Sequence, residues 1–597
     1  MPRPRTPSTP ALTALALLSA VLLAATGCTA PAPDESPSGT PSTADSASPP
    51  GKTGPDGGGD PEGSTPAPSP SADVLQEQAV AAGHPEAVQV GTEILDRGGN
   101  AADAAIATAF AVAVVEPFAS GLGGGGSTLV AQGAEAPLAY DYRETVSETG
   151  EIPVSGAGVP GLVDGMATLH AEHGSMEWSE LLAPATELAE EGFPVSGMLA
   201  QRMRSDYGPG AIAGLEQFHG PGGAPLAEGE ELVQTELADT LQTLAQEGSE
   251  SFYTGSLASR LTAVDGLDAA SLAEYETVST EPVAGAMGDH TLVSAAPPLP
   301  GAGVVQFLQV AEALGAAEAE PGSAEYVEAM AAAWQVAEDS VNESLGDPAF
   351  VEVPVDRLTD AEANAELARS EVAPALAAAR EPASPVRTAS AAGSQQPLEQ
   401  PIEAGNTTHL TVVDSTGMTV SMTNTITSFW GGEHAQEVGG FFLNNQLSRF
   451  EALDTPANQP EPGRKSVSWS APSLVLDAQG RVVMGLGSPG GQAIPSILAG
   501  VLVPWALQDA PLQQAVDAPR HYLQDEVLAL EEEPAGEVTA LVRQRGWQPH
   551  VTERADAVFG SVQALEIDYE AGTVTGAVDS RREGDVAVVP ADGRGVK

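Results

Sequence analysis

The sequence predicts a mixed α/β fold, in which helices and strands alternate along most of the chain. Two helical patterns, 87–97 and the alanine-rich 101–115, precede a strand pattern at 127–131. A hairpin pattern occupies residues 407–425, and a later strand runs into a glycine-rich turn and an apolar helix at 493–507. The 597 residues are 42% hydrophobic, which is ample for a large buried core.

The first 73 residues predict export. Residues 1–27 carry arginines near the start and an apolar run, 14–25, which is the pattern of a secretory signal. Cys28, the only cysteine, follows directly and predicts lipidation, so we expect an exported lipoprotein anchored to a bacterial membrane, at the cell surface or facing the periplasm. An ordinary secreted protein is the alternative. Residues 28–73 are rich in Ser, Pro, Gly and Thr and predict a disordered tether.

The formal net charge of −58 excludes several partners. Lysine occurs only at Lys52, Lys465 and Lys597, so no basic patch is available to hold nucleic acid. An anionic membrane surface would repel the body of the protein, which leaves the lipid anchor as the expected membrane contact. A single cysteine also excludes an intramolecular disulfide.

The first globular elements are two helices and a strand. Apolar spacing over 87–97 ends at a Gly-Gly pair, and Asn100 is placed to cap the helix 101–115. The glycine run 121–126 then precedes the strand 127–131. Because neither Gly-Lys-Ser/Thr nor a helix follows, this run predicts close packing, or close approach of backbone to a ligand, rather than a phosphate loop.

Residues 159–380 predict mainly helices. A short strand at 138–142 comes before them, and Arg143, just past it, would on its own be taken as a surface salt-bridge partner. The histidines of this region lack metal-ligand spacing. Residues 380–405 predict a flexible linker that ends at Asn406. The expected helices are Gly161–His173, Glu180–Glu191, Leu232–Gln246 and Ala324–Ser340.

The hairpin pattern brings two threonines together. Apolar residues alternate with polar ones on both strands, and the loop 415–417 has Gly417 in the position that favours a left-handed conformation. If Asp414 then pairs with Met418, Thr407 falls opposite Thr425. Directly opposed residues have Cβ atoms about 4.5–5.5 Å apart, so the two hydroxyls can meet.

A threonine is a poor nucleophile unless a base lies beside it. One solution uses the threonine's own α-amine as that base, once the chain has been cut just before the residue. A flexible linker that runs into a strand beginning with Thr-Thr suits a precursor cleaved between Asn406 and Thr407. The alternative, from the hairpin alone, is one ordinary hairpin among many.

A second candidate site element follows strands expected at 466–476 and 481–485. Gly490 and Gly491 lie in the turn before the apolar helix 493–507, where backbone N–H groups are unpaired and the helix dipole favours negative charge. Such a turn can serve as an oxyanion hole. The alternative is a simple strand–helix connection.

Several spaced motifs resemble the γ-glutamyltransferase (γ-glutamyltranspeptidase) family. The resemblance starts at Thr407–Asp414, with Gly417 and Thr425 following, and it covers the chain from about Ala79 to the C-terminus. The other matching motifs, in the family's order, are Leu95–Asp103, Val115–Pro117, Gly121–Gly126, Tyr142–Thr145, Gly158–Gly161, Leu345–Pro348, Leu443–Gln446, Gly487–Gly491 and Ala518–Arg520.

The resemblance implies an N-terminal-nucleophile hydrolase with a four-layer αββα sandwich. It implies one precursor that cleaves itself into a large subunit, 74–406, and a small subunit, 407–597, which stay together as a heterodimer. Thr407 would be the nucleophile and Thr425 its hydrogen-bond partner, while Gly490 and Gly491 would form the oxyanion hole. Arg143 matches the arginine that clamps the substrate's α-carboxylate, a task suited to the guanidinium fork. No metal or organic cofactor is implied.

The sequence departs from the family in its substrate-binding positions. Family members hold the substrate's α-ammonium with an acidic residue three places after Gln446, and here that place is Arg449. The usual Ser-Ser pair aligns with Ser468-Trp469, and an Asn after the second threonine is Thr427. The lead function is γ-glutamyl transfer or hydrolysis.

Arg449 puts glutathione in doubt as the donor, because a fixed cation repels an ammonium. The first alternative is an acylase or poly-γ-glutamate depolymerase, whose donor has no free α-amine. The second alternative is a non-catalytic surface lipoprotein that keeps the fold.

Overall fold

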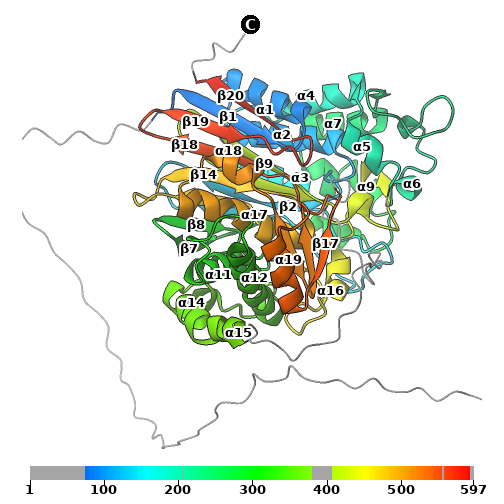
Figure 1. Ribbon diagram of the computed structural model, residues 1–597. Coiled ribbons are helices and arrows are strands. Elements are labelled where there is room, and N and C mark those ends of the chain that lie inside the picture. Colours follow the sequence, from blue (N-terminus) through cyan, green and yellow to red (C-terminus); the bar gives the residue numbers. More distant parts are fainter. Residues whose placement is uncertain (1–73, 206, 379–405, 554–556, 592–597) are drawn as a thin grey trace, which may run out of the picture. The chain divides into compact units, whose positions relative to one another are not determined.

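The computed structural model describes residues 74–205, 207–378, 406–553 and 557–591, all within one unit of the chain (Figure 1). The expected signal, the lipidation site Cys28 and the tether lie outside the described residues, as does the expected linker 380–405. No helix among the described residues is long and apolar enough to cross a membrane.

Two antiparallel sheets form the centre of the fold. The larger has seven strands in the order β20-β1-β9-β10-β2-β3-β6, and the smaller has six in the order β19-β18-β14-β13-β8-β7. The strands of the larger sheet are β1 (Glu77–Ala82), β2 (Gly125–Ala131), β3 (Leu138–Asp141), β6 (Val278–Thr280), β9 (Thr408–Val413), β10 (Thr419–Thr425) and β20 (Asp585–Pro590). Those of the smaller sheet are β7 (Val283–Met287), β8 (His290–Ser294), β13 (Ser473–Leu476), β14 (Val482–Gly487), β18 (Gln563–Asp568) and β19 (Thr573–Ala577).

The inner faces of the two sheets pack on each other. Side chains alternate between the faces of a strand, so every second residue of β9 points inward. One buried cluster joins Ala79, Leu129 and Val413 of the larger sheet to Leu474 and Leu565 of the smaller one. The outward residues of the same strands belong to two other clusters, each shared with helices.

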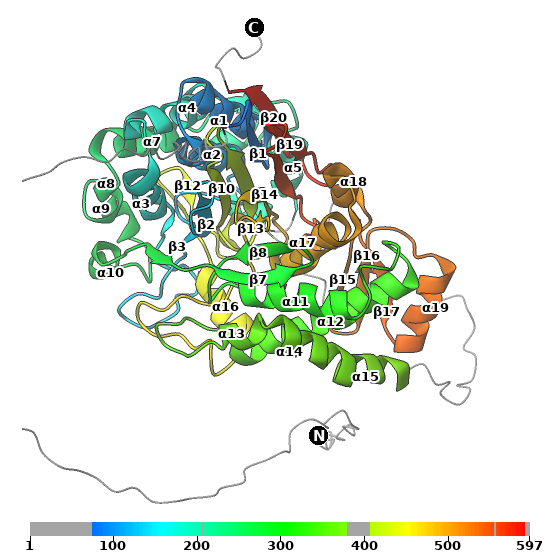
Figure 2. The ribbon, with the colours of Figure 1, turned by 90° about the vertical axis from the view of Figure 1, so that its left-hand side faces the viewer.

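Helices cover both outer faces, so the expected four-layer αββα sandwich is confirmed. In Figures 1 and 2, α1, α2, α4 and α7 lie on the side of the larger sheet, and α11 and α12 lie on the side of the smaller one. The longer helices of the first layer are α1 (Pro85–Asp96), α2 (Ala101–Val115), α3 (Leu162–His173), α4 (Trp178–Glu191) and α7 (Thr235–Glu247). Those of the second are α11 (Gly301–Ala313), α12 (Ala324–Ser344), α17 (Ile494–Leu502), α18 (Leu512–Asp517) and α19 (Gly536–Arg545).

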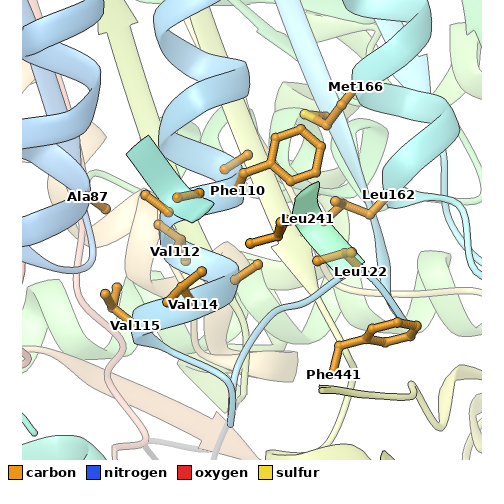
Figure 3. Packing of buried hydrophobic residues seen from close by; sticks show 14 of the residues in the cluster. Ala87, Phe110, Val112, Val114, Val115, Leu122, Leu162, Met166, Leu241 and Phe441 are labelled. Carbon is orange, nitrogen blue, oxygen red and sulfur yellow. The ribbon is translucent and has the colours of Figure 1, made fainter. Parts of the chain in front are cut away.

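Helix α2 is the central element of the first helix layer. All of its residues are buried, and Figure 3 shows Phe110 and its neighbours packed with Met166 and Leu241. Asn100 caps it as expected, in a reciprocal pair of hydrogen bonds with Asp103. Because α2 lies against β9 and β10, its C-terminal end at Val115 comes close to the start of the hairpin.

Shorter elements complete the described chain. The small strands are β4 (Phe193–Pro194), β5 (Glu231–Leu232), β11 (Glu437–Val438), β12 (Phe441–Phe442), β15 (His521–Gln524), β16 (Val527–Leu530) and β17 (Gln548–Val551). The short helices are α5 (Gly197–Arg202), α6 (Gly208–Ala211), α8 (Glu250–Tyr253), α9 (Ala258–Leu261), α10 (Ala269–Ala273), α13 (Val355–Leu358), α14 (Ala361–Leu367), α15 (Ala373–Ala378) and α16 (Arg449–Ala452).

Several sequence expectations need correction. The stretch 159–380, expected to be mainly helical, also contains β6, β7 and β8, which extend both central sheets. The helix expected from Leu232 begins at Thr235, since Leu232 pairs with Phe193. The strand expected over 466–476 forms only at its end, in β13, and the helix expected over 493–507 is α17 followed by a π-helical turn from Val503.

Candidate active site

The hairpin has the register that the sequence predicts. Thr408 pairs with Asn424 and Val413 with Thr419, and the N–H of Asp414 donates to the Met418 carbonyl at 3.0 Å. Gly417 takes the left-handed conformation, with φ of 78°. The next position therefore sets Thr407 opposite Thr425, and Thr407 Oγ1 donates to Thr425 Oγ1 at 3.2 Å.

The glycine run that leads into β2 packs closely against β10. A Cβ on Gly124 would overlap the Thr425 carbonyl, and a Cβ on Gly126 would overlap the side chain of Asn424. Gly125 pairs directly with Thr425 in the sheet. The glycines let β2 lie close against β10, which fixes the end of the strand that carries Thr425.

His409 is a site neighbour that sequence reasoning missed. It is fully buried on the inner face of β9, where its Nδ1 lies 2.8 Å from Thr423 Oγ1 and its Nε2 lies 3.1 Å from Thr411 Oγ1. Burial lowers the pKa of His409 to about 3, so the ring is neutral at neutral pH. A Cβ on Gly487 would overlap the His409 ring, which shows that the ring packs directly against the end of β14.

The glycine turn after β14 faces the same cavity as the hairpin. Gly490 has φ of 141° and Gly491 has φ of 56°, and both values favour glycine. Gly491 opens a 3-10 turn that leads into α17 at Ile494. Gly491 lines a cavity together with Thr407, which places a candidate oxyanion donor near the candidate nucleophile.

This cavity brings together most of the residues that the sequence singled out. Its volume is about 10 Å³, which is room for about one water. Its walls are Asn406, Thr407, Thr425, Thr427, Gln446, Arg449, Ser468, Trp469, Ser470, Gly491 and Ile494. Neither Gly490 nor Arg143 is among these lining residues.

A chain of hydrogen bonds links the lining residues. Thr425 Oγ1 accepts from the N–H of Thr427 at 2.8 Å, and Thr427 Oγ1 donates to Gln446 Oε1 at 2.5 Å. Gln446 Nε2 in turn donates to Ser466 Oγ at 2.9 Å. Thr427 and Gln446 are therefore held in place by each other and by Thr425 in the uncleaved chain.

Arg143 lies behind this chain rather than in the cavity wall. Its guanidinium donates to the carboxylate of Asp141 through two nitrogens, at 3.1 and 2.8 Å, and to the Ser466 carbonyl at 2.8 Å. Although burial raises the pKa of Asp141, the charges of Arg143 and Lys465 hold it well below its usual range. Arg143 therefore supports the backbone of Ser466, two residues before Ser468.

The backbone at Asn406–Thr407 is strained. Thr407 has φ of 146°, a value that costs a β-branched residue about 1–3 kcal/mol and persists only where the surroundings impose it. Asn406 Nδ2 donates to the carbonyls of Phe118 at 2.9 Å and Ser428 at 2.8 Å, and Asn406 Oδ1 is buried without a hydrogen-bond partner. The strain therefore lies at the bond that the sequence predicts to be cut.

Among the described residues, no group of three or more His, Cys, Asp or Glu side chains is arranged to hold a metal ion. The polar groups that converge on the cavity are hydroxyls, amides and one guanidinium. This set of groups can activate a hydroxyl and stabilise an oxyanion, which is the chemistry of acyl transfer.

Comparisons with known proteins agree with this geometry. The family model described as Gamma-glutamyltranspeptidase matches residues 87–589. The Capsule biosynthesis protein CapD proenzyme of Bacillus anthracis is 33% identical over 85% of this chain and 89% of its own length. The Glutathione hydrolase proenzyme of Bacillus subtilis (strain 168) is 30% identical over 86% of this chain and 91% of its own. The solved structure of cephalosporin acylase from Bacillus halodurans has the same fold, with a TM-score of 0.72 at 24% identity, covering 88% of this chain and 98% of that one.

Proposed function

Because this chain belongs to the γ-glutamyltranspeptidase family, an enzyme family of N-terminal-nucleophile hydrolases, we propose that Thr407 is its nucleophile after self-cleavage at Asn406–Thr407. The substrates are amides of γ-glutamyl or closely related acyl groups. One observation carries the proposal: the Thr407 hydroxyl, bonded to Thr425 at 3.2 Å, lies in one cavity with Gly491, at a strained peptide.

Self-cleavage uses the hydroxyl before the amine is free. Thr407 Oγ attacks the carbonyl carbon of Asn406, the C–N bond breaks, and the acyl group passes from nitrogen to oxygen as an ester. Water then hydrolyses the ester, which leaves a carboxylate on Asn406 and a free α-amine on Thr407. Release of the strained φ at Thr407 supports the first of these steps.

Amide cleavage reuses the same hydroxyl with the new amine as base. The Thr407 amine takes the hydroxyl proton while Oγ attacks the substrate carbonyl, and N–H groups of the turn at Gly490 and Gly491 hold the oxyanion. The intermediate collapses to an acyl-enzyme, and the leaving amine takes the proton. Attack by water gives hydrolysis, and attack by an amino acid or peptide amine gives transfer.

The cavity wall favours donors without a free α-ammonium. Arg449 and Trp469 both line the cavity. A guanidinium in the cavity wall disfavours an ammonium beside it, because like charges repel. Trp469 occupies the position where the family has a second serine hydroxyl. Its ring centroid lies 5.9 Å from that of Trp334. We therefore place glutaryl amides and internal units of poly-γ-glutamate ahead of glutathione.

A matched pair of anilides tests the donor. γ-Glutamyl and glutaryl anilides differ only in the α-amino group, and we expect the wild type to favour the glutaryl compound at least tenfold in kcat/KM, which corresponds to about 1.4 kcal/mol. Arg449→Asp should shift the preference toward the γ-glutamyl compound. A wild-type preference for γ-glutamyl anilide would overturn the donor assignment and leave the nucleophile assignment untouched.

Thr407→Ala tests the nucleophile. The variant has no hydroxyl at the cleavage point, so we expect one uncut polypeptide on a denaturing gel and by intact mass. We also expect no anilide cleavage, followed as the absorbance of the released aniline. Cleavage at Asn406–Thr407 in this variant would rule out the proposed chemistry. A wild type that stays uncut would instead support the alternative of a non-catalytic protein that keeps the fold.

Export and lipid anchoring are a separate proposal, motivated by residues 1–28 alone. Cys28→Ser removes the thiol that would carry the lipid. We expect it to move the protein from the membrane fraction to the medium or periplasm and to abolish labelling by a radioactive fatty acid. Equal labelling of both proteins would exclude Cys28 as the anchor.

A further inference from the structure

A buried guanidinium that does not line the cavity binds the main chain of Thr407. Arg582, shortly before β20, is 7% exposed, and its Nη1 donates to the Thr407 carbonyl oxygen at 3.2 Å. Its Nη2 donates to the Ala557 carbonyl at 3.5 Å. Arg582 is not among the residues that line the cavity, so it acts on the backbone of Thr407 rather than in the substrate space.

Glu116, which follows the last residue of α2, is an acidic neighbour of Arg582. It is 6% exposed, and its Oε2 accepts from Thr408 Oγ1 at 2.7 Å. Burial raises the pKa of Glu116, and Thr408 and Arg582 oppose that rise. Burial lowers the pKa of Arg582 to about 10, with Glu116 opposing, so the guanidinium stays charged at neutral pH.

The space around the carboxylate is closed. A Cβ on Gly83 would lie 2.8 Å from Glu116 Oε2 and 2.9 Å from Thr408 Oγ1, so the loop after β1 seals this side of the site. Glu116 and Arg582 together therefore fix the peptide between Thr407 and Thr408 from two elements that are far apart in the sequence.

Thr407 is in this way held on both of its sides. Upstream, Asn406 Nδ2 bonds the carbonyls of Phe118 and Ser428, and downstream Arg582 bonds the carbonyl of Thr407 itself. None of these three hydrogen bonds uses the Thr407 hydroxyl. They impose the backbone conformation with φ of 146°, which decides where Oγ and the amide nitrogen point.

We propose that Arg582, supported by Glu116, is a positioning residue that aligns Thr407 both for self-cleavage and for later amide cleavage. This inference rests on the proposed function, in which Thr407 is the nucleophile. The Thr407 carbonyl remains in the chain after cleavage, so the same contact serves both reactions. A nucleophile displaced by about 1 Å can lose about a hundredfold in rate, which sets the scale of the expected effect.

The first test measures self-cleavage. Precursor is made in a short cell-free pulse, and the loss of the full-length band is followed in the folded, protease-resistant fraction. We expect Arg582→Met to slow this step about tenfold or more. Arg582→Lys should fall between Met and wild type, because lysine keeps the charge but not the planar fork.

The second test separates positioning from a general loss of structure. In the cleaved enzyme Arg582→Met should lower kcat and leave KM unchanged, since Arg582 does not line the cavity. Glu116→Gln combined with Arg582→Met should cost little more than Arg582→Met alone, because the two side chains act as one unit. Arg545→Met is the matched control: it removes an arginine whose side chain is 6% exposed and is paired with Glu328, in the second helix layer. It should lower the unfolding midpoint and leave the rate per folded molecule unchanged.

The outcomes distinguish this inference from the proposed function. If the wild type cleaves and Arg582→Met cleaves equally fast, the positioning role is wrong and the proposed function stands. If the wild type stays uncut, the proposed function is wrong, and this inference, which rests on it, is wrong as well. If Arg582→Met does not fold, the same rates are measured in Arg582→Lys and Glu116→Gln. Self-cleavage and amide-cleavage rates within about twofold of wild type in both variants would overturn the inference.

Discussion

Glu144 is a buried carboxyl that lies close to the end of β10. It is fully buried, neither of its oxygens has a hydrogen-bond partner, and burial raises its pKa to about 8. A Cβ on Gly125 would lie 3.1 Å from Glu144 Oε2, and Gly125 pairs with Thr425. Since paired residues of a sheet point to the same face, the neutral carboxyl lies on the face that carries the two threonines.

The raised pKa of Glu144 makes stability depend on pH. Between its usual value near 4.5 and about 8, the folded state keeps the proton and the unfolded state releases it. The contribution is therefore fully present below pH 4.5 and is lost as the pH rises toward 8. We expect Glu144→Gln, compared with wild type in an uncleaved Thr407→Ala background, to gain relative stability from pH 5 to pH 8, by on the order of a few kcal/mol.

Urea unfolding at both pH values measures this difference. The comparison is between two proteins at each pH, so the titration of all other groups cancels to first order. A stability difference that stays constant from pH 5 to pH 8 would mean that Glu144 is ionised in the folded protein, in conflict with its burial without a partner.

At the scale of elements, the contact between β9 and β14 connects the two halves of the site. Because the His409 ring occupies the space beside Gly487, Gly487→Ala must push β14 away and displace the turn that carries Gly491. We expect a loss of about 1–3 kcal/mol in unfolding free energy, as for other overpacked cores, together with slower self-cleavage. Thermal unfolding and the cleavage rate measure the two effects.

Gly500→Ala is the control for this substitution. Gly500 lies inside α17, and a Cβ there would meet nothing within 4 Å. Alanine in a helix interior is favoured over glycine by about 0.5–1 kcal/mol, so this variant should be neutral or stabilised and should cleave normally. Equal stabilities and cleavage rates of the two alanine variants would show that the contact with His409 does not position β14.

The elements also show what sequence can predict. The hairpin register followed from its three-residue loop and alternating pattern, both of which are local, and Asn100 was a local capping signal. Residues 466–472 were expected to pair as a strand, but their backbone binds side chains instead: the carbonyl of Ser466 accepts from the Arg143 guanidinium at 2.8 Å, and that of Pro472 accepts from Ser294 Oγ at 3.2 Å. Such long-range partners leave no periodic trace.

The same limit applies to the site. Thr407, Thr425 and Gly491 were predictable because their chemistry resides in local motifs, and the structure brings all three to one cavity. Glu116 and Arg582 were missed, since their meeting beside the Thr407–Thr408 peptide depends on the packing of chain segments several hundred residues apart. Arg143 also matched a motif; its guanidinium donates to the Ser466 carbonyl, and its role in substrate binding stays a prediction.

At the scale of the whole molecule, the described strands of the two proposed subunits are interleaved. In the larger sheet, β1 from residues before Asn406 lies between β20 and β9 from residues after it. In the smaller sheet, β13 of the second segment pairs with β8 of the first. Both sheets therefore contain strands from each side of the cleavage point, and neither segment has a complete core of its own.

This interleaving predicts that self-cleavage leaves the two polypeptides inseparable under native conditions. To dissociate, β1 would have to break its ladders with both neighbours and expose the apolar faces buried by α1 and α2. We expect the cleaved wild type to elute as one species on gel filtration and to separate only in denaturant. Because cleavage turns one chain into two, the refolding yield and the unfolding midpoint should depend on protein concentration for the cleaved wild type and not for uncleaved Thr407→Ala. Elution of free small subunit in native buffer would contradict the interleaved arrangement, whatever the outcome of the activity assays.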